Sequence, residues 1–331
     1  MRITILGGGW YGCHLAAALC DSFEVSLLEK APRLFNGASG SNPARLHIGP
    51  HYPRSRETRL ACQSHSEQFL KFYGKLTRGI GRNLYAVATH DSLVDFGNYV
   101  QTLRQEIDLL RVHDPAEFQL ANVDGAIIVA ERHILIDKAR EYFATLLGNT
   151  VTYNAPAARP PWPPLDDELL IDCTFCSNDA EGVDRYEPCL TVLMEGPTDQ
   201  AVTIMDGPFP SLYPWREDAN LCSLTSAKYT PLARYTAWDA ADRHLREIKA
   251  EDIADRTTAM IEQMAFYYPP LMDTHRRAGE LLSIRAMPRS GADSRLVQVL
   301  HVARNHLRIR AGKIDAIFEA ERQVIDRKSV V

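Results

Sequence analysis

Residues 2–12 read RITILGGGWYG, an apolar run that passes directly into a cluster of glycines. Residues 2–6 alternate around Ile3 and Ile5 as a strand does, and residues 14–19 carry small and apolar side chains at helical spacing. A second apolar run, residues 24–28, follows closely. This order predicts a strand, a tight turn, a helix and a second strand, the βαβ unit of a parallel sheet.

The glycines form the pattern Gly7-x-Gly9-x-x-Gly12, placed between the predicted strand and helix. In a dinucleotide-binding turn these glycines allow the tight turn, the close approach of a diphosphate and the packing of helix on strand. The diphosphate then rests on the helix N-terminus, so Trp10 and Tyr11, inside the pattern, are expected cofactor contacts too. Glu29 ends the second strand, where its carboxylate can accept hydrogen bonds from ribose hydroxyls.

The pattern leaves two questions open. A glycine-rich turn in an unrelated α/β protein is one alternative, although strand, spacing, helix and acidic residue all agree with a cofactor site. The pattern also serves NAD and FAD equally, because an acid at Glu29 disfavours only a ribose that carries a 2′-phosphate.

Length, composition and charge limit the possible domain organisation, partners and location of the protein. A chain of 331 residues, 45% of them hydrophobic, is long enough for two interleaved lobes. The formal charge of -5 gives no electrostatic reason to expect nucleic acid, and no apolar run is long enough for a membrane span. With no signal peptide in view, we expect a cytoplasmic protein. The seven cysteines show neither a disulfide framework nor a metal spacing, so no metal is expected.

The remainder of the chain predicts two kinds of structure. Residues 36–55 form an irregular segment that is longer than a loop needs to be to connect two elements, so they are expected to carry function. Helical spacing appears at 57–76, 98–110, 136–147 and 238–268. An apolar strand at 169–173 is typical of a parallel sheet. Four further strand-like runs, separated by turn residues, favour an antiparallel sheet in a second lobe that covers a ligand; they are residues 188–194, 201–205, 211–214 and 221–225.

The irregular segment also carries a family resemblance. Glu29-Lys30 followed by residues 37–52, GASGSNPARLHIGPHY, resembles the flavin-contacting loop of the D-amino-acid-oxidase-like FAD-dependent oxidoreductases, which include glycine and sarcosine oxidases. Around His47 and Tyr52 it is also similar to L-2-hydroxyglutarate dehydrogenase. The resemblance implies FAD as the cofactor and nominates further contacts to it, namely Lys30, Ser39, Asn42, Arg45, Leu46 and His47.

Two weaker matches extend the resemblance. Asp172-Cys173-Thr174 resembles the second cofactor contact of the family, although Phe175 and Cys176 stand where a small residue and glycine are usual. Residues 310–314 resemble the last flavin contact, which nominates Gly312, Lys313 and Ile314 near the start of a terminal helix.

The three segments imply an α/β fold: a glutathione-reductase-type, Rossmann-like FAD-binding domain interleaved with an α+β substrate domain that has an antiparallel sheet. Residues 1–75, 136–185 and 275–331 are assigned to the first domain, and residues 76–135 and 186–274 to the second.

The resemblance also suggests which residues take part in catalysis and substrate binding. His47 and His51 lie on one loop and can take a proton, contact the flavin or anchor it; alternatively, one of them only satisfies backbone groups. Arg285 or Arg289 is expected to hold a substrate carboxylate, the alternative for Arg285 being an ion pair. Residues expected to line the substrate site are Tyr52 and Tyr213, the latter equally suited to an ordinary core position.

We therefore predict an enzyme that oxidises a C–N bond of a small, carboxylate-bearing amino acid or amine by hydride transfer to flavin N5. Oxidation of a 2-hydroxy acid is the first alternative. A flavin monooxygenase ranks lower, because the sequence has neither the Trp-x-Trp-x-Ile-Pro signature of halogenases nor an Asp-Gly and Gly-Asp pair placed as in aromatic hydroxylases. A protein that binds FAD without catalysis is the remaining alternative.

Overall fold

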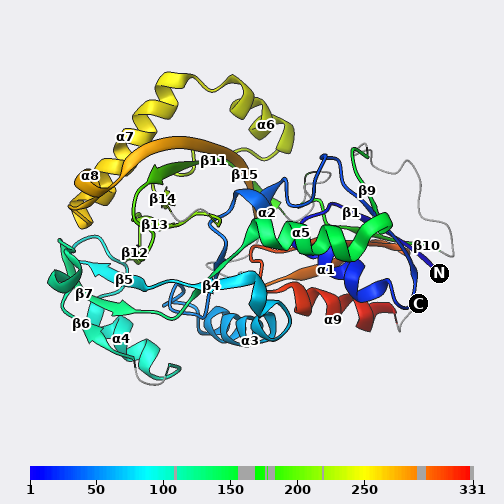
Figure 1. Ribbon diagram of the computed structural model, residues 1–331, viewed down its shortest axis with the longest axis horizontal. Coiled ribbons are helices and arrows are strands. Elements are labelled where there is room, and N and C mark those ends of the chain that lie inside the picture. Colours follow the sequence, from blue (N-terminus) through cyan, green and yellow to red (C-terminus); the bar gives the residue numbers. More distant parts are fainter. Residues whose placement is uncertain are drawn as a thin grey trace.

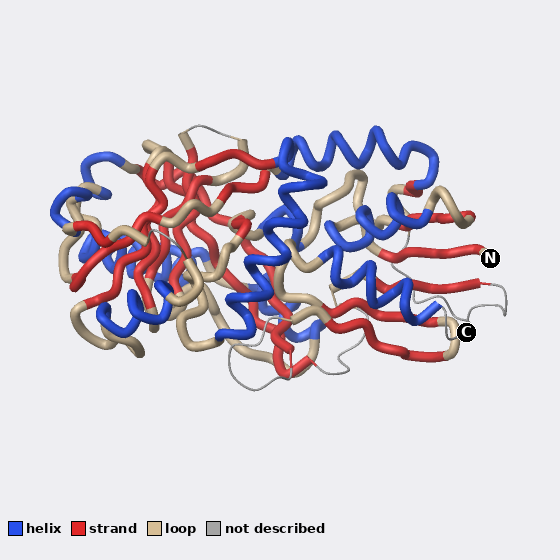
Figure 2. The backbone as a smooth tube through the Cα atoms, turned by 90° about the horizontal axis from the view of Figure 1, so that it is seen from below, coloured by secondary structure: helices blue, strands red, loops and turns tan. Residues whose placement is uncertain are grey.

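The first layer of the fold is a six-stranded sheet at the end of the molecule where both chain termini lie (Figures 1 and 2). The computed structural model describes residues 1–107, 110–155, 168–175, 177, 183–217, 220–288 and 296–328. The strand order of this sheet is β16 (Gln298–Ala303), β17 (His306–Arg310), β10 (Glu168–Asp172), β1 (Arg2–Leu6), β2 (Glu24–Leu28) and β9 (Val151–Thr152).

The pairing confirms the predicted βαβ unit. Strand β1 runs parallel to both β2 and β10, and β10 runs parallel to β17, so segments from the start, middle and end of the chain share one sheet. Helix α1 (Trp10–Leu19) contacts both α5 (Ile136–Leu147) and α9 (Ile317–Lys328) beside this sheet. Their buried side chains join those of α3 (Arg56–Tyr73) in one apolar core.

A second, eight-stranded sheet forms the other half of the molecule. Its strand order is β15 (Arg276–Pro288), β11 (Val183–Glu195), β14 (Leu221–Ser226), β13 (Pro210–Pro214), β12 (Gln200–Met205), β5 (Arg82–Ala88), β7 (Val123–Ile128) and β6 (Val112–His113). All of its neighbouring strands run antiparallel except β5 and β12, which are parallel. The predicted antiparallel sheet of the second lobe is therefore present.

Helices cover both faces of the second sheet, as the alternation along β5 shows. Leu84 and Ala86 pack in the cluster that includes α7 (Ala250–Tyr267) and α8 (Leu271–Thr274). Tyr85 and Val87, on the opposite face, pack with α4 (Phe96–Arg104). Figure 1 shows α7 and α4 on opposite sides of these strands.

Strand β15, within the range 275–331, pairs along its length with β11 and is the edge strand of the second sheet. Two expectations about the helices need correction. The helix expected over 238–268 is divided into α6 (Trp238–Glu247) and α7, because Ile248 is extended. Helix α4 ends at Arg104, earlier than the predicted residue 110.

A small third sheet lies between the two large ones. It consists of β3 (Arg45–Leu46), β8 (Arg132–Ile134) and β4 (Thr77–Gly79), all antiparallel. Leu46 and Ile134 point into the core of the first half. Arg45, on the opposite face, reaches hydroxyl groups of β12 and β13 in the second half, so this sheet connects the two layers.

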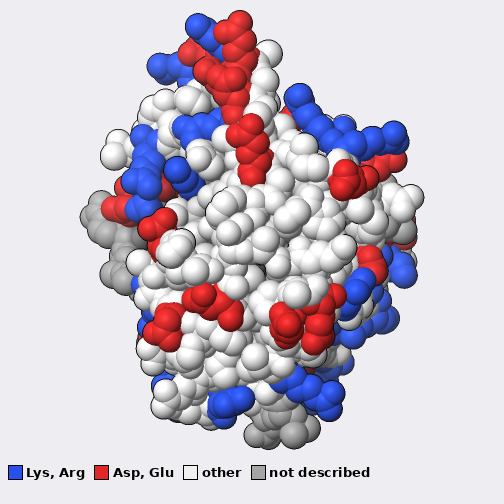
Figure 3. All heavy atoms as spheres, turned by 90° about the vertical axis from the view of Figure 1, so that its left-hand side faces the viewer, with Lys and Arg blue, Asp and Glu red and all other residues white. Residues whose placement is uncertain are grey.

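The face shown in Figure 3 has an uncharged centre, and side chains of both charge signs stand around its margin. Within the described ranges, no helix combines the length and the apolar character that crossing a bilayer requires.

Candidate active site and FAD-binding loop

The glycine turn has the backbone geometry that a diphosphate site requires. Gly7 adopts φ +96°, a conformation that favours glycine, and a Cβ on Gly12 would lie 1.9 Å from the Gly7 carbonyl oxygen. A Cβ on Gly9 would lie 2.8 Å from Ser39 Oγ. Backbone, and not side chains, therefore forms the surface of this turn, so an anion can approach the helix N-terminus closely.

Ser39 and Glu29 border the turn. The amide of Trp10 donates to Ser39 Oγ (3.1 Å), which brings the loop after β2 against the start of α1. The buried carboxylate of Glu29 accepts from the amides of Gly8 (2.7 Å) and Ala31 (2.8 Å). These bonds fix the acid at the end of β2, beside the turn, and a carboxylate has further lone pairs for ribose hydroxyls. The chemistry of this donor and acceptor set fits the ADP part of FAD.

The aromatic residues of the glycine pattern have different surroundings from each other. The indole of Trp10 is buried against Phe35 and Phe143, with ring centroids 5.0 and 5.7 Å away, so this side chain builds the core. The hydroxyl of Tyr11 donates to the Lys313 carbonyl (2.5 Å) and ties the first helix to the C-terminal cofactor segment. A contact from Trp10 to the cofactor would therefore come from its backbone.

The loop after β2 is held by local bonds. Asn42 Nδ2 donates to the Ala38 carbonyl (2.8 Å) and its Oδ1 accepts from the Ala44 amide (2.7 Å), so the side chain shapes the turn itself. Leu46 is buried in the core, whereas Lys30 is exposed. Arg45, in β3, bonds to hydroxyl groups of the second sheet, and His47 follows one residue after the end of this strand.

The later cofactor segments converge on the same end of the first sheet. Thr174 donates through its amide (2.9 Å) and its hydroxyl (2.6 Å) to Asp172, at the end of β10. Gly312 is exposed and Ile314 packs against the core. The terminal helix begins at Ile317, so its N-terminus lies farther along the chain than the sequence suggested.

Three aromatic side chains gather where the flavin loop meets the second sheet. The rings of His47 and His51 stack with centroids 4.8 Å apart, and the ring of Tyr52 lies edge-on to both, at 5.7 and 5.1 Å. His51 Nδ1 is buried and has no hydrogen-bond partner among the described residues. Burial lowers the pKa of His51 well below its usual value, and the charges of His47, Arg45 and Lys313 act in the same direction, whereas Glu131 opposes them. The site therefore favours the neutral form of the His51 imidazole.

Glu131 anchors this group and was not foreseen from the sequence. Its carboxylate is fully buried and accepts from His47 Nδ1 (3.0 Å), the Tyr85 hydroxyl (2.7 Å) and the amide of Ile48 (3.2 Å). Burial alone would raise the pKa of Glu131, but the charge and hydrogen bond of His47, with the bond from Tyr85, lower it to about 2. Glu131 is therefore an ionised carboxylate in contact with His47.

Lys313 adds a buried cation on the other side of Tyr52. Its ammonium lies 4.8 Å from the centre of the Tyr52 ring, 2.5 Å from Cys62 Sγ and 3.4 Å from Asp315. Burial is the largest influence and would lower the pKa of Lys313, but Asp315, Tyr52 and Cys62 together outweigh burial and raise it. The lysine side chain thus stays charged at the border of the histidine cluster.

The expected substrate residues do not all meet at this cluster. Tyr213 is buried beneath the guanidinium of Arg45, which lies 4.0 Å from its ring centre. Arg285 is occupied by the buried Glu187, with Arg285 Nη2 to Glu187 Oε2 at 2.5 Å, as the ion-pair alternative anticipated. Arg289 and Cys176 lie outside the described residues.

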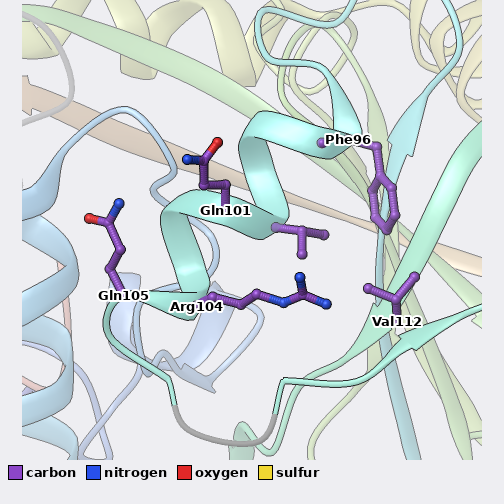
Figure 4. Close-up of a pocket in the computed structure, with 7 residues that line it drawn as sticks. Phe96, Gln101, Arg104, Gln105 and Val112 are labelled. Carbon is purple, nitrogen blue, oxygen red and sulfur yellow. The ribbon is translucent and has the colours of Figure 1, made fainter.

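A groove elsewhere in the molecule does not involve the nominated residues. It has a volume of about 700 Å³ and lies on α4. Figure 4 shows Arg104 extending from the helix beside Val112, below Phe96. The groove is separate from the flavin loop, and within the described residues no cluster of histidine, cysteine or acidic side chains could hold a metal ion.

The fold and the glycine turn together define a FAD-dependent oxidoreductase, and comparison with known proteins agrees. L-alpha-glycerophosphate oxidase from Mycoplasma pneumoniae, with FAD bound, superimposes with a TM-score of 0.70 at 15% identity, covering 98% of this chain and 93% of that one. Glycine oxidase from Geobacillus kaustophilus gives a TM-score of 0.69 at 12% identity, covering 97% and 92%.

A relative found by sequence comparison defines the family of the chain more narrowly than the fold does. The FAD-dependent monooxygenase FPY4 of Fusarium mangiferae is 33% identical over 342 residues, which span 98% of this chain and 90% of that protein. No family model matches the chain. The chain belongs to the family of the FAD-dependent monooxygenase FPY4, it has the fold of the D-amino-acid-oxidase-like flavoproteins, and its cofactor is FAD. The predictions of fold class, family and cofactor are confirmed.

Proposed function

We propose that the protein oxidises a small substrate at a carbon that bears an amino group, with His51 as the general base. The observation that carries this proposal is the buried Nδ1 of His51, which has no hydrogen-bond partner among the described residues and belongs to a ring whose burial favours the neutral form. When bound, FAD supplies the acceptor for a hydride. Such a reaction also requires a group that takes the proton leaving the heteroatom, and His51 Nδ1 suits that task.

Glu131 favours a proton on His51, although burial and the charge of His47 oppose it. An imidazole that takes a proton becomes a cation, and Glu131 raises the pKa of His51 against the other influences around it. His47 stands between the two, stacked on His51 and bonded to Glu131. The ionised carboxylate therefore offsets the positive charge that proton transfer would create in this buried site.

The same geometry also suits a hydroxyl group, so oxidation of a 2-hydroxy acid is the first alternative. A monooxygenase is the second, and the name of the relative FPY4 supports it. The two classes differ in what reduces the flavin. An oxidase or dehydrogenase takes electrons from the substrate itself, whereas a monooxygenase that inserts oxygen needs a separate reductant before oxygen reacts.

Anaerobic flavin reduction separates these alternatives. The purified, FAD-loaded protein is mixed without oxygen with amino acids, amines or 2-hydroxy acids, and the flavin absorbance is followed. We expect bleaching by at least one amine or amino acid. Bleaching only by hydroxy acids selects the first alternative. Bleaching by NADH or NADPH but by none of the substrates selects the monooxygenase, and a flavin that only dithionite reduces selects a binding protein without this catalysis.

A further inference from the structure

One buried arginine holds the backbone of the loop that carries His51. Arg59, near the start of α3, directs Nη1 back to the carbonyl oxygens of Tyr52 (3.1 Å) and Pro53 (2.6 Å). These two residues directly follow His51 in the chain. Only 5% of the Arg59 side chain is exposed, so water competes little for these hydrogen bonds. Loss of the Arg59 guanidinium would therefore release the backbone beside the His51 imidazole.

The rest of the same guanidinium binds a carboxylate from the segment after α4. Arg59 Nε lies 2.7 Å from Glu106 Oε2 and Nη2 lies 3.0 Å from Oε1, so the pair is bidentate. The Glu106 side chain is 4% exposed, and its other cation is the exposed Arg56, at 3.4 Å. All three nitrogens of Arg59 thus have acceptors, in a planar fork that a lysine cannot reproduce.

Helix α4 supplies a second hold on the loop, on the other side of His51. The hydroxyl of Tyr99, which is fully buried, donates to the Pro50 carbonyl (3.1 Å). Gly49 adopts φ +117°, and a Cβ there would lie 3.3 Å from the Arg59 carbonyl oxygen, so the loop passes directly against the backbone of α3. The residues before and after His51 are therefore both fixed by side chains from outside the loop.

The imidazole of His51 is oriented chiefly by its backbone and by ring packing. It stacks on His47 and lies edge-on to Tyr85, with ring centroids 6.0 Å apart in the second case. No described group forms a hydrogen bond with Nδ1 that could fix the ring. A shift of the loop backbone therefore changes the position of Nδ1 directly.

We infer that Arg59, held by Glu106, is a positioning residue that places the His51 imidazole for proton transfer. It acts through the carbonyls of Tyr52 and Pro53. The inference rests on the proposed function, because His51 is the base named there. A displacement of about 1 Å in such a group costs a reaction about 100-fold in rate. The competing explanation is that Arg59 only compensates the buried charge of Glu106.

Three variants separate these two roles. Arg59→Met removes the donors to the loop and leaves Glu106 charged. The double variant Arg59→Met with Glu106→Gln removes both charges, so stability should recover while the loop still lacks its donors. Arg59→Lys keeps the charge but not the fork. Met264→Ala is the control, because it creates a cavity in the core beneath α7 and lowers stability without touching the loop.

Each variant is compared with the native protein in four measurements. These are FAD content, the urea midpoint, and the limiting rate and substrate dissociation constant of anaerobic flavin reduction. In addition, the ring signals of His51 are recorded by NMR in protein labelled with ¹⁵N-histidine and are identified by their loss in His51→Asn. His133, which is fully buried on the small sheet, is the internal reference.

We expect Arg59→Met and the double variant to retain FAD, to reduce it about 100-fold more slowly and to bind substrate with little change. The His51 signals should move while those of His133 stay. Arg59→Lys should recover part of the rate, and Met264→Ala should keep the native rate despite a lower urea midpoint.

A double variant that regains the native rate together with its stability would show that Arg59 only compensates Glu106. Unmoved His51 signals in the double variant would also overturn the inference. If Arg59→Met does not fold, the double variant and Arg59→Lys give the same comparisons. Failure of the proposed function appears separately, because no substrate then reduces the flavin of the native protein, whereas the NMR comparison still reports whether Arg59 positions His51.

Discussion

Replacement of Glu131 by glutamine tests the charge that organises the site. Glutamine keeps the size of the side chain and can still bond to Tyr85, whose hydroxyl can turn to accept, but it removes the negative charge beside His47. The pKa of Glu131 lies at about 2, against 4.5 for the free side chain. This difference corresponds to about 3 kcal/mol of folding free energy at pH 7.

The contribution of the Glu131 charge to the free energy of unfolding decreases as the pH falls. A carboxyl group with a lowered pKa stabilises the folded protein fully above about pH 4.5, and the contribution is lost as the pH falls toward 2. We therefore expect Glu131→Gln to lower the free energy of unfolding by about 3 kcal/mol at pH 7, and by only about 1.4 kcal/mol at pH 3.

Urea unfolding of the native protein and the variant, at a series of pH values from 7 to 3, measures this difference. Thr257→Val, at a buried polar side chain in α7, is a control that carries no charge and should give a difference independent of pH. If the difference for Glu131→Gln is the same at pH 7 and pH 3, the reasoning about an ionised, buried carboxylate is wrong.

Three further variants test separate parts of the molecule. Gly9→Val should abolish FAD retention, because even its Cβ would meet Ser39 Oγ; a variant that purifies fully yellow contradicts the cofactor site. His51→Asn should retain FAD but slow anaerobic flavin reduction by about 100-fold or more, and an unchanged rate would exclude His51 as the base. Arg59→Met should cost about 3 kcal/mol of stability in urea, since it leaves the buried Glu106 with only its longer contact to the exposed Arg56, and an unchanged urea midpoint would refute this.

The cofactor site was largely predictable from the sequence, because its determinants are local. The glycine pattern, the two apolar strands and Glu29 lie within about thirty residues, and each acts through backbone geometry that a short segment specifies by itself. The same holds for the flavin loop, whose Ser39 and Asn42 bond to neighbouring backbone as well as to the start of α1. The fold class followed from these features and from the family resemblance. The domain boundaries remain a prediction.

The partners in the active site were not predictable, because they come from distant segments. Glu131 stands 84 positions from His47 in the sequence, and a charged residue next to a strand usually faces solvent. Only the pairing of β3 with β8 brings Glu131 beside His47 and places His133 between Arg45 and Arg78. In the same way, Arg285 resembled a carboxylate ligand until the pairing of β15 with β11 set Glu187 against it.

The sequence by itself therefore determined the class of cofactor and the turn expected to bind it, since local backbone geometry is encoded locally. The tertiary structure alone decided which charged groups pair with each other. Ion pairing depends on distances of a few ångströms between strands far apart in the chain, and those distances exist only after the sheets have formed.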